Sequence, residues 1–169
     1  RTMPFLYDGT LPETPIAYNP EVDLWARALS KTQLPLVAAL VDVIIPGDDE
    51  SPSASDLHIP DFIDEWISAP YPQQQKDRPV ILAGLSWINK ESRKRFKKGF
   101  VKLSRKHQLA ICNDISDPST AKPIYDSAVA FFLRFQMLTY AAYFSTETGK
   151  ADLGDNPLPT FELPSKEGR

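Results

Sequence analysis

The sequence is poor in the residues that form covalent cross-links and metal sites. Its 169 residues include one cysteine, Cys112, and two histidines, His58 and His107. A single thiol excludes a disulfide within the chain. Transition-metal sites usually draw three or four histidine, cysteine or carboxylate ligands together. Because the two histidines fall on different predicted elements, we expect solvated or capping roles for them and no metal site.

Long apolar runs and glycine-rich motifs are also missing. No run approaches the roughly 18–20 apolar residues that a membrane-spanning helix requires. The seven glycines form neither a GxGxxG turn nor a GxxxxGK loop, the two motifs that hold nucleotide phosphates. We therefore expect no integral membrane segment and no dinucleotide bound by this chain itself.

Catalytic constellations are equally scarce. Cys112 falls on the apolar side of a predicted helix, where a cysteine is usually a small buried hydrophobe, and His107 falls on a different side of that helix. The acidic run at residues 48–50 lacks the alternating ligands, mid-loop glycine and closing glutamate of a calcium-binding EF-hand loop. The sequence predicts no catalytic, cofactor-binding or metal-binding residue.

The net charge of −3 conceals a strong segregation of charge along the chain. Residues 1–76 carry 4 basic and 12 acidic side chains, whereas residues 77–110 carry 10 basic and 2 acidic ones. Such a basic block is typical of a solvated helix face, of a surface for an anionic partner or lipid headgroups, or of a nucleic-acid site. The acidic pI of about 5.4 makes nucleic acid the least favoured of these.

Apolar residues at intervals of three and four predict an all-α fold of about five or six helices. The first helix begins with Ser30 or Thr32 as its cap, and the second alternative places Pro35 in the first turn. The third helix is expected to have Asp77 as its cap, and a separate basic helix follows with a break at Gly99. No strand pattern is present, and everything after residue 145 is predicted to be loop. The predicted helices cover residues 30–45, 60–67, 78–88, 91–103, 105–115 (Leu109, Cys112 and Ile111 or Ile115 facing inwards) and 123–144.

Proline and aromatic residues mark both ends as extended arms, residues 1–29 and 151–169, around one helical domain at residues 30–150. Prolines at this density prevent a regular helix, and aromatic residues are uncommon in free tails. We expect the arms to lie on a surface, either of the domain itself or of another subunit. The predicted partner contacts on the arms and the acidic loop are Phe5, Tyr7, Tyr18, Trp25, Asp48, Asp49, Leu158 and Phe161.

Several blocks, in order, resemble the gluconate 2-dehydrogenase subunit 3 family. The two most diagnostic are LVAALVDVIIP at residues 36–46 and ASDLHIPDFID at residues 54–64. Further similar blocks lie at residues 84–89, 96–103, 131–139 and 143–149. The chain departs from the family at residues 152–156, where DLGDN stands in place of the family's Gly-Tyr-x-Gly-Asn motif.

The resemblance implies a helical subunit without a cofactor of its own. It implies a large FAD-containing catalytic subunit of the glucose-methanol-choline type as partner, and a cytochrome c subunit that carries haem c. It also implies a periplasmic location, twin-arginine export of the complex, and contact with the inner membrane only through the complex. The expected function is therefore that of a non-catalytic small subunit that stabilises and escorts the catalytic chain. Alternatives are a stand-alone helical enzyme or metal-binding protein and, less favoured, a nucleic-acid adaptor.

Overall fold

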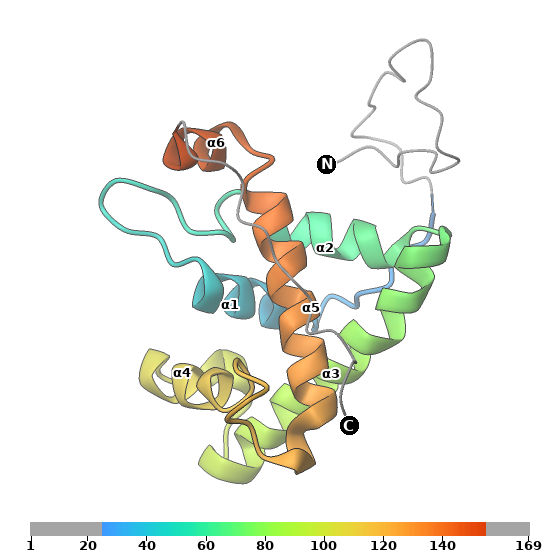
Figure 1. The fold of residues 1–169 in the computed structure, drawn as a ribbon, viewed down its shortest axis with the longest axis vertical. Helices are drawn as coiled ribbons and strands as arrows, with labels where there is room; N and C mark the ends of the chain where they lie inside the picture. Colours follow the sequence, from blue (N-terminus) through green and yellow to red (C-terminus); the bar gives the residue numbers. More distant parts are fainter. Residues whose placement is uncertain (1–24, 155–169) are drawn as a thin grey trace.

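The computed structural model describes residues 25–154, and within them the fold is all-α, as the sequence predicts. Figure 1 shows the arrangement, with α5 running through the middle of the molecule. The elements are α1 (Leu34–Ile44), α2 (Ile59–Ser68), α3 (Pro72–Phe96), the 3-10 turn η1 (Phe100–Lys102), α4 (Arg105–Asn113), the 3-10 turn η2 (Pro123–Tyr125), α5 (Asp126–Tyr143) and α6 (Glu147–Leu153).

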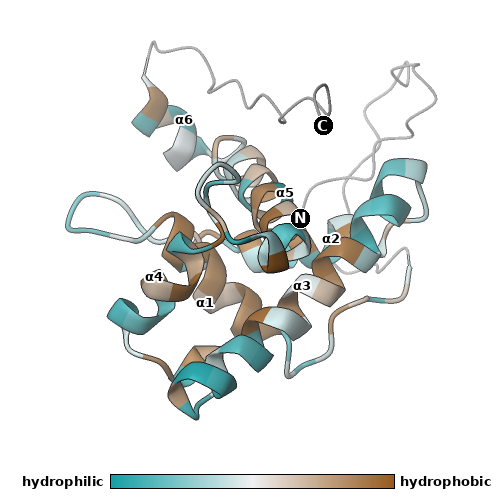
Figure 2. Cartoon of the chain, turned by 60° about the horizontal axis from the view of Figure 1, so that its bottom comes forward, coloured by the Kyte–Doolittle hydropathy of each residue, from teal (hydrophilic) through white to brown (hydrophobic). Residues whose placement is uncertain are grey.

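The core forms where α3 and α5 cross and α1 and α2 pack against them. Phe131 and Phe135 of α5 are almost fully buried, with ring centroids 5.6 Å apart. Leu40 of α1 and Ile63 of α2 are fully buried on neighbouring helices. In Figure 2 α1 is largely brown, whereas the loop that follows it is pale or teal, so apolar residues concentrate where helices meet. The prediction that residues 123–144 form the central apolar helix is confirmed.

Prolines position the ends of the first two helices. Pro35 lies in the first turn of α1, where its missing amide proton costs no intrahelical bond. Before that turn, the Gln33 side chain accepts a hydrogen bond from the Ser30 amide at 2.9 Å, which is the backward bond of the predicted capping box. The predicted cap residue is wrong, because Gln33 directly precedes the helix and neither Ser30 nor Thr32 caps it. Pro60 occupies the first turn of α2 in the same way. The helix–loop–helix pattern predicted for residues 30–67 is therefore confirmed, with α1 beginning at Leu34.

The prediction of two helices at residues 78–88 and 91–103 is wrong, because a single helix of 25 residues, α3, covers Pro72–Phe96. Asp77 lies inside α3 and is buried, so it does not cap the helix. Pro79 is also internal and removes one backbone hydrogen bond, which packing on α5 and α2 offsets. The helix ends at Phe96, and the next residue, Lys97, closes it with a left-handed φ of 58°, just before the break predicted at Gly99.

Two further expectations are corrected at α4 and α6. Leu109 of α4 is 37% exposed, whereas Ile111, Cys112 and Ile115 are buried, so the inward face is rotated relative to the prediction. Residues 147–153, predicted to be loop, form α6, whose first turn is capped by Thr146 Oγ1 accepting from the Gly149 amide at 3.0 Å. None of the helices in residues 25–154 is long and apolar enough to cross a membrane.

Candidate partner interface

The acidic loop, defined here as residues 46–58, joins α1 to α2 and holds a fixed shape. Asp48 Oδ1 accepts hydrogen bonds from the amides of Glu50 at 2.9 Å and Ser51 at 2.8 Å. These bonds to the carboxylate lower the pKa of Asp48. Further along, the Ser55 amide donates to Asp42 of α1 at 2.8 Å. The loop backbone is therefore held by its own Asp48 and by Asp42 of the preceding helix.

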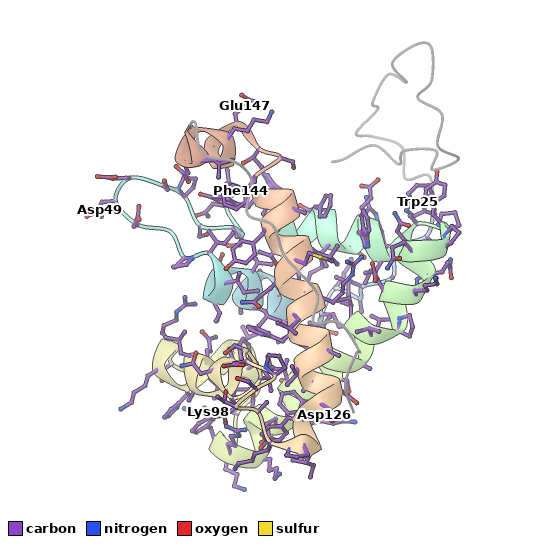
Figure 3. All side chains as sticks on the ribbon, in the orientation of Figure 1. Trp25, Asp49, Lys98, Asp126, Phe144 and Glu147 are labelled. Atoms are coloured by element: carbon purple, nitrogen blue, oxygen red, sulfur yellow. The ribbon has the colours of Figure 1, made fainter. Side chains whose placement is uncertain are left out.

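The charges at the tip of this loop point into solvent. Asp48, Asp49 and Glu50 are all exposed. Figure 3 shows Asp49 at the outer end of the loop, on the same side of the molecule as Glu147 of α6. None of the three tip carboxylates forms an ion pair with a cation in residues 25–154. Within residues 25–154 the tip thus presents unpaired negative charge on a hydrogen-bonded loop backbone.

Asp152 of α6 connects the acidic loop to the end of α5. Its Oδ1 accepts a hydrogen bond from Ser51 Oγ at 3.1 Å, and its Oδ2 accepts one from the Tyr143 hydroxyl. Burial and the hydrogen bond to Asp152 raise the pKa of Tyr143 to about 12, so the phenol stays protonated and continues to donate. The acidic loop and α6 therefore form one surface.

The described end of the predicted N-terminal arm, residues 25–29, lies on the domain's own α2. The Leu29 amide donates to Asp64 Oδ1 at 2.9 Å, and the Ala28 amide donates to Ser68 Oγ at 2.8 Å. Arg27 forms an ion pair with Glu65 at 3.3 Å. Trp25 packs edge-on against Tyr71, with ring centroids 6.0 Å apart. For these residues the surface that receives the arm is α2 and the turn after it.

The buried carboxyl that anchors this segment gives a pH-dependent prediction. Burial raises the pKa of Asp64 above its ordinary value of 3.8. The charged form therefore destabilises the fold at pH values above the folded-state pKa, and this cost disappears as the pH falls through that pKa to below 3.8. An asparagine at this position would keep an oxygen acceptor for the Leu29 amide without the charge.

We therefore expect Asp64→Asn to raise the free energy of unfolding at pH 7 and to lose this advantage at acid pH. Urea unfolding of both proteins between pH 3 and pH 8 measures the difference. A matched control is Asp56→Asn in the acidic loop, where the residue is exposed. An Asp64→Asn variant that is less stable than the native chain at pH 7 would contradict the argument.

Other strongly charged groups inside the fold pair with one another across helices. The Asp77 carboxylate of α3 accepts hydrogen bonds from Arg134 Nε of α5 at 2.8 Å and from Trp66 Nε1 of α2 at 2.7 Å. At the far end of α3, Arg95 binds Glu91 at 2.7 Å and Asp114 at 2.6 Å. These pairs join three helices and a loop, and their geometry is that of structural contacts.

The structure also shows the surroundings of the cysteine and of one histidine, the side chains with catalytic potential. Cys112 is buried, and burial raises the pKa of its thiol to about 12, so it is protonated at neutral pH. His107 stacks on Phe96, with ring centroids 4.0 Å apart. Across residues 25–154 no group of three or more histidine, cysteine, aspartate or glutamate side chains is arranged to hold a metal ion.

Three of the predicted contact residues fall within the described residues, and the structure does not bring all of them together. Asp48 and Asp49 lie at the tip of the acidic loop, whereas Trp25 lies near the start of α3, on another side of the molecule (Figure 3). The other predicted contacts, Phe5, Tyr7, Tyr18, Leu158 and Phe161, lie outside the described residues.

The sequence reading missed the contribution of α6 to this surface. Thr146 followed by Glu147 has the form of a helix cap with an acidic first turn, and this signal could have revealed the helix. The bonds of Asp152 to Ser51 and Tyr143 join residues far apart in sequence, so no local pattern could have shown them.

The described chain is thus a small all-α protein whose most distinctive exposed features are an acidic loop surface and a basic end. Residues 31–158 match the family model of gluconate 2-dehydrogenase subunit 3, and the chain belongs to that family. Members are accessory subunits of a dehydrogenase complex, which implies partner subunits. No curated protein and no solved structure gives a significant match to the chain.

Proposed function

We propose that this chain is the non-catalytic small subunit of a periplasmic, flavin-dependent sugar or sugar-acid dehydrogenase complex. In this role it stabilises the catalytic subunit and escorts it through twin-arginine export. The FAD belongs to a large catalytic subunit of the glucose-methanol-choline type, and haem c belongs to a cytochrome subunit. The chain meets the inner membrane only through these partners. Its membership of an accessory-subunit family supports the proposal.

The observation that carries the proposal is the rigid acidic surface made by the loop tip and α6. Gathering Asp48, Asp49 and Glu50 without a paired cation among residues 25–154 is unfavourable for this part of the chain, because like charges repel. A partner with a basic surface would relieve this repulsion, and complementary charge gives both specificity and fast association. The carboxylate bonds that fix the loop backbone keep the charges pre-positioned, which reduces the entropy lost on binding.

The first test is co-expression of the catalytic subunit with and without this chain. We expect most of the soluble, FAD-loaded catalytic subunit in the periplasmic fraction to be lost when the chain is omitted, because the surface that the chain covers would be exposed to aggregation. Yield, flavin content and cell fractionation measure the effect. Full and stable activity without the chain, or sugar oxidation by the isolated chain, would contradict the proposal.

A second arm of the same test addresses the acidic surface. The double substitution Asp49→Asn and Glu50→Gln removes two exposed charges and leaves the Asp48 hydrogen bonds intact. Exposed ion pairs contribute about 0.2–1 kcal/mol each, so affinity for the catalytic subunit should fall roughly twofold to thirtyfold. The effect should shrink at high salt.

The matched control is Gln75→Lys with Ser86→Lys, which changes the net charge equally at exposed positions of α3. Biolayer interferometry against the purified catalytic subunit compares the two variants. Equal losses of affinity in both variants would show a general charge effect, and the acidic loop would then not be part of the interface. The co-expression experiment tests the role of the chain independently of this result.

A further inference from the structure

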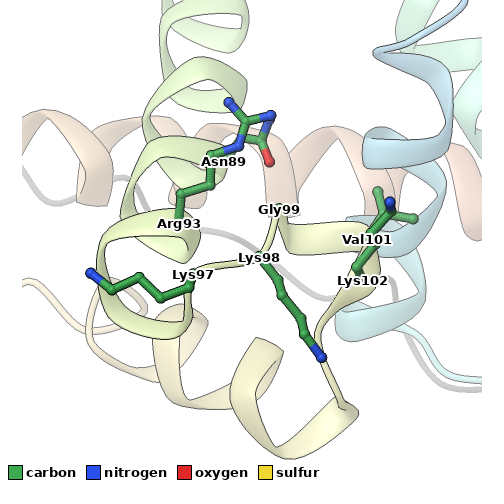
Figure 4. A pocket seen from close by; sticks show the side chains of 7 residues that line it. All are labelled: Asn89, Arg93, Lys97, Lys98, Gly99, Val101 and Lys102. Atoms are coloured by element: carbon green, nitrogen blue, oxygen red, sulfur yellow. The ribbon is translucent and has the colours of Figure 1, made fainter.

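The C-terminal end of α3 contains an open pocket lined by basic side chains. It lies where α3 ends and η1 begins and has a volume of about 600 Å³. Figure 4 shows Arg93 from the last turns of α3, Lys97 and Lys98 from the turn, and Lys102 from η1. Asn89 and Val101 complete the wall. Pockets of this size accommodate small organic ligands.

The positive charge of this pocket is not neutralised by neighbouring acids. Arg93, Lys97, Lys98 and Lys102 form no ion pair with any carboxylate in the described part of the chain. The nearby Glu91 is already engaged by Arg95 at 2.7 Å and by Lys94 at 3.7 Å. Four cations therefore surround one space without a counter-charge among residues 25–154.

Compensation of the helix dipole accounts for only part of this charge. A helix C-terminus carries about half a negative charge, and Lys97 Nζ already donates to the carbonyl of Lys94 there at 3.3 Å. Arg93, Lys98 and Lys102 remain in excess of that requirement. Basic residues placed only to stabilise the end of α3 would not need to extend into η1.

The hydrogen-bonding groups of the pocket favour an anion as well. Asn89 uses its Oδ1 to accept from the Phe100 amide at 3.2 Å, so its Nδ2 donor remains without a partner in residues 25–154. With the four cations, the wall offers donors and no carboxylate. A chloride ion would fill little of the volume, and a carboxylate would offer only two acceptor oxygens. A phosphate group offers more acceptor oxygens, and it carries one negative charge as a diester and up to two as a monoester.

We propose that this pocket is a binding site for a phosphate group, either in a soluble phosphate compound or in the headgroup of an anionic phospholipid. Lys97 and Lys98 extend in different directions in Figure 4, so a ligand held by both would require one or both side chains to turn toward it. This role is separate from the contact with the catalytic subunit and is measurable on the isolated chain.

The test uses the full ¹⁵N-labelled chain and two sources of phosphate. Titration with inorganic phosphate and pyrophosphate at constant ionic strength should give saturable amide shifts centred on Lys98 and Gly99. The double variant Lys98→Gln with Lys102→Gln should bind roughly twofold to thirtyfold more weakly, as expected for the loss of two exposed charge pairs. Lys31→Gln with Lys76→Gln, at exposed positions outside the pocket, makes the same charge change and should bind like the native chain.

Co-sedimentation with phosphatidylglycerol vesicles, and with phosphatidylcholine vesicles as the neutral reference, distinguishes the sources. Vesicle binding that only the pocket variant loses supports the site with a lipid headgroup as ligand. Saturable binding of free phosphate without vesicle binding supports a soluble phosphate compound. Three results would overturn the proposal. The chain could bind neither free phosphate nor vesicles, the two double variants could weaken binding equally, or equimolar chloride could cause the same amide shifts.

Discussion

Replacing Asp77 with alanine is expected to lower the free energy of unfolding by about 3–5 kcal/mol, because it leaves the partly buried guanidinium of Arg134 without its partner. Asp77 is 4% exposed and receives two hydrogen bonds from Arg134, one from Trp66 Nε1 and one from Gln73 Nε2 at 3.0 Å. The substitution removes all four and breaks the link between α2, α3 and α5. Urea unfolding followed by circular dichroism measures the loss.

The control distinguishes an unpaired charge from a simple loss of contacts. The double variant Asp77→Leu with Arg134→Met replaces both charges with apolar groups, which is often nearly neutral for a buried pair. It should therefore recover a large part of the stability lost in Asp77→Ala. Glu147→Ala, which breaks the exposed pair with Lys150, should change stability by less than about 1 kcal/mol. A double variant less stable than Asp77→Ala would contradict the explanation.

Gly84→Ala is expected to destabilise the crossing of α3 and α5, although alanine is the better helix former. A Cβ at this position would lie 1.9 Å from Cγ of the buried Phe131 ring, so the ring or the helices must move. Overpacking of a core costs about 1–3 kcal/mol and occasionally more, whereas the gain in helix propensity is about 1 kcal/mol. The overlap here is severe, so we expect a net loss of about 2 kcal/mol by urea unfolding.

Two variants on the same helices test this packing argument. Ser86→Ala changes an exposed position of α3 and should be neutral or slightly stabilising. Phe131→Leu destabilises the native chain by removing ring volume, yet in combination with Gly84→Ala it should cost less than the sum of the single effects. Strict additivity of the two substitutions would show that the Gly84 side of α3 does not meet Phe131.

The fold was predictable wherever local chemistry decided it. Pro35 and Pro60 mark helix starts because a proline in the first turn loses no hydrogen bond, and the apolar face of residues 126–143 identifies the central helix. Prediction failed where a distant residue decided the outcome. Asp77 has the side chain of a typical helix cap, but Arg134, 57 positions further on, provides the charge that allows it to be buried. The start of α3 was missed for this reason.

The functional surfaces were likewise predictable only where local sequence determines them. The acidity of residues 48–50 and the basic block are visible in the sequence, because charge is a property of each residue alone. The pocket is not visible there, since it requires the left-handed turn at Lys97 to bring η1 beside the last turns of α3. The pairing of the acidic loop with α6 likewise depends on contacts across most of the chain.

The hydrogen bond between Ser51 and Asp152 has a consequence for the order of folding. It joins residues 101 positions apart, and such distant contacts form only after most of the intervening chain has become ordered. On the ribosome, α1 and α2 emerge long before α6, so the acidic loop gains its tie to α6 only when synthesis has passed residue 152. A catalytic subunit that recognised the loop and α6 together would thereby engage finished domains in preference to nascent ones.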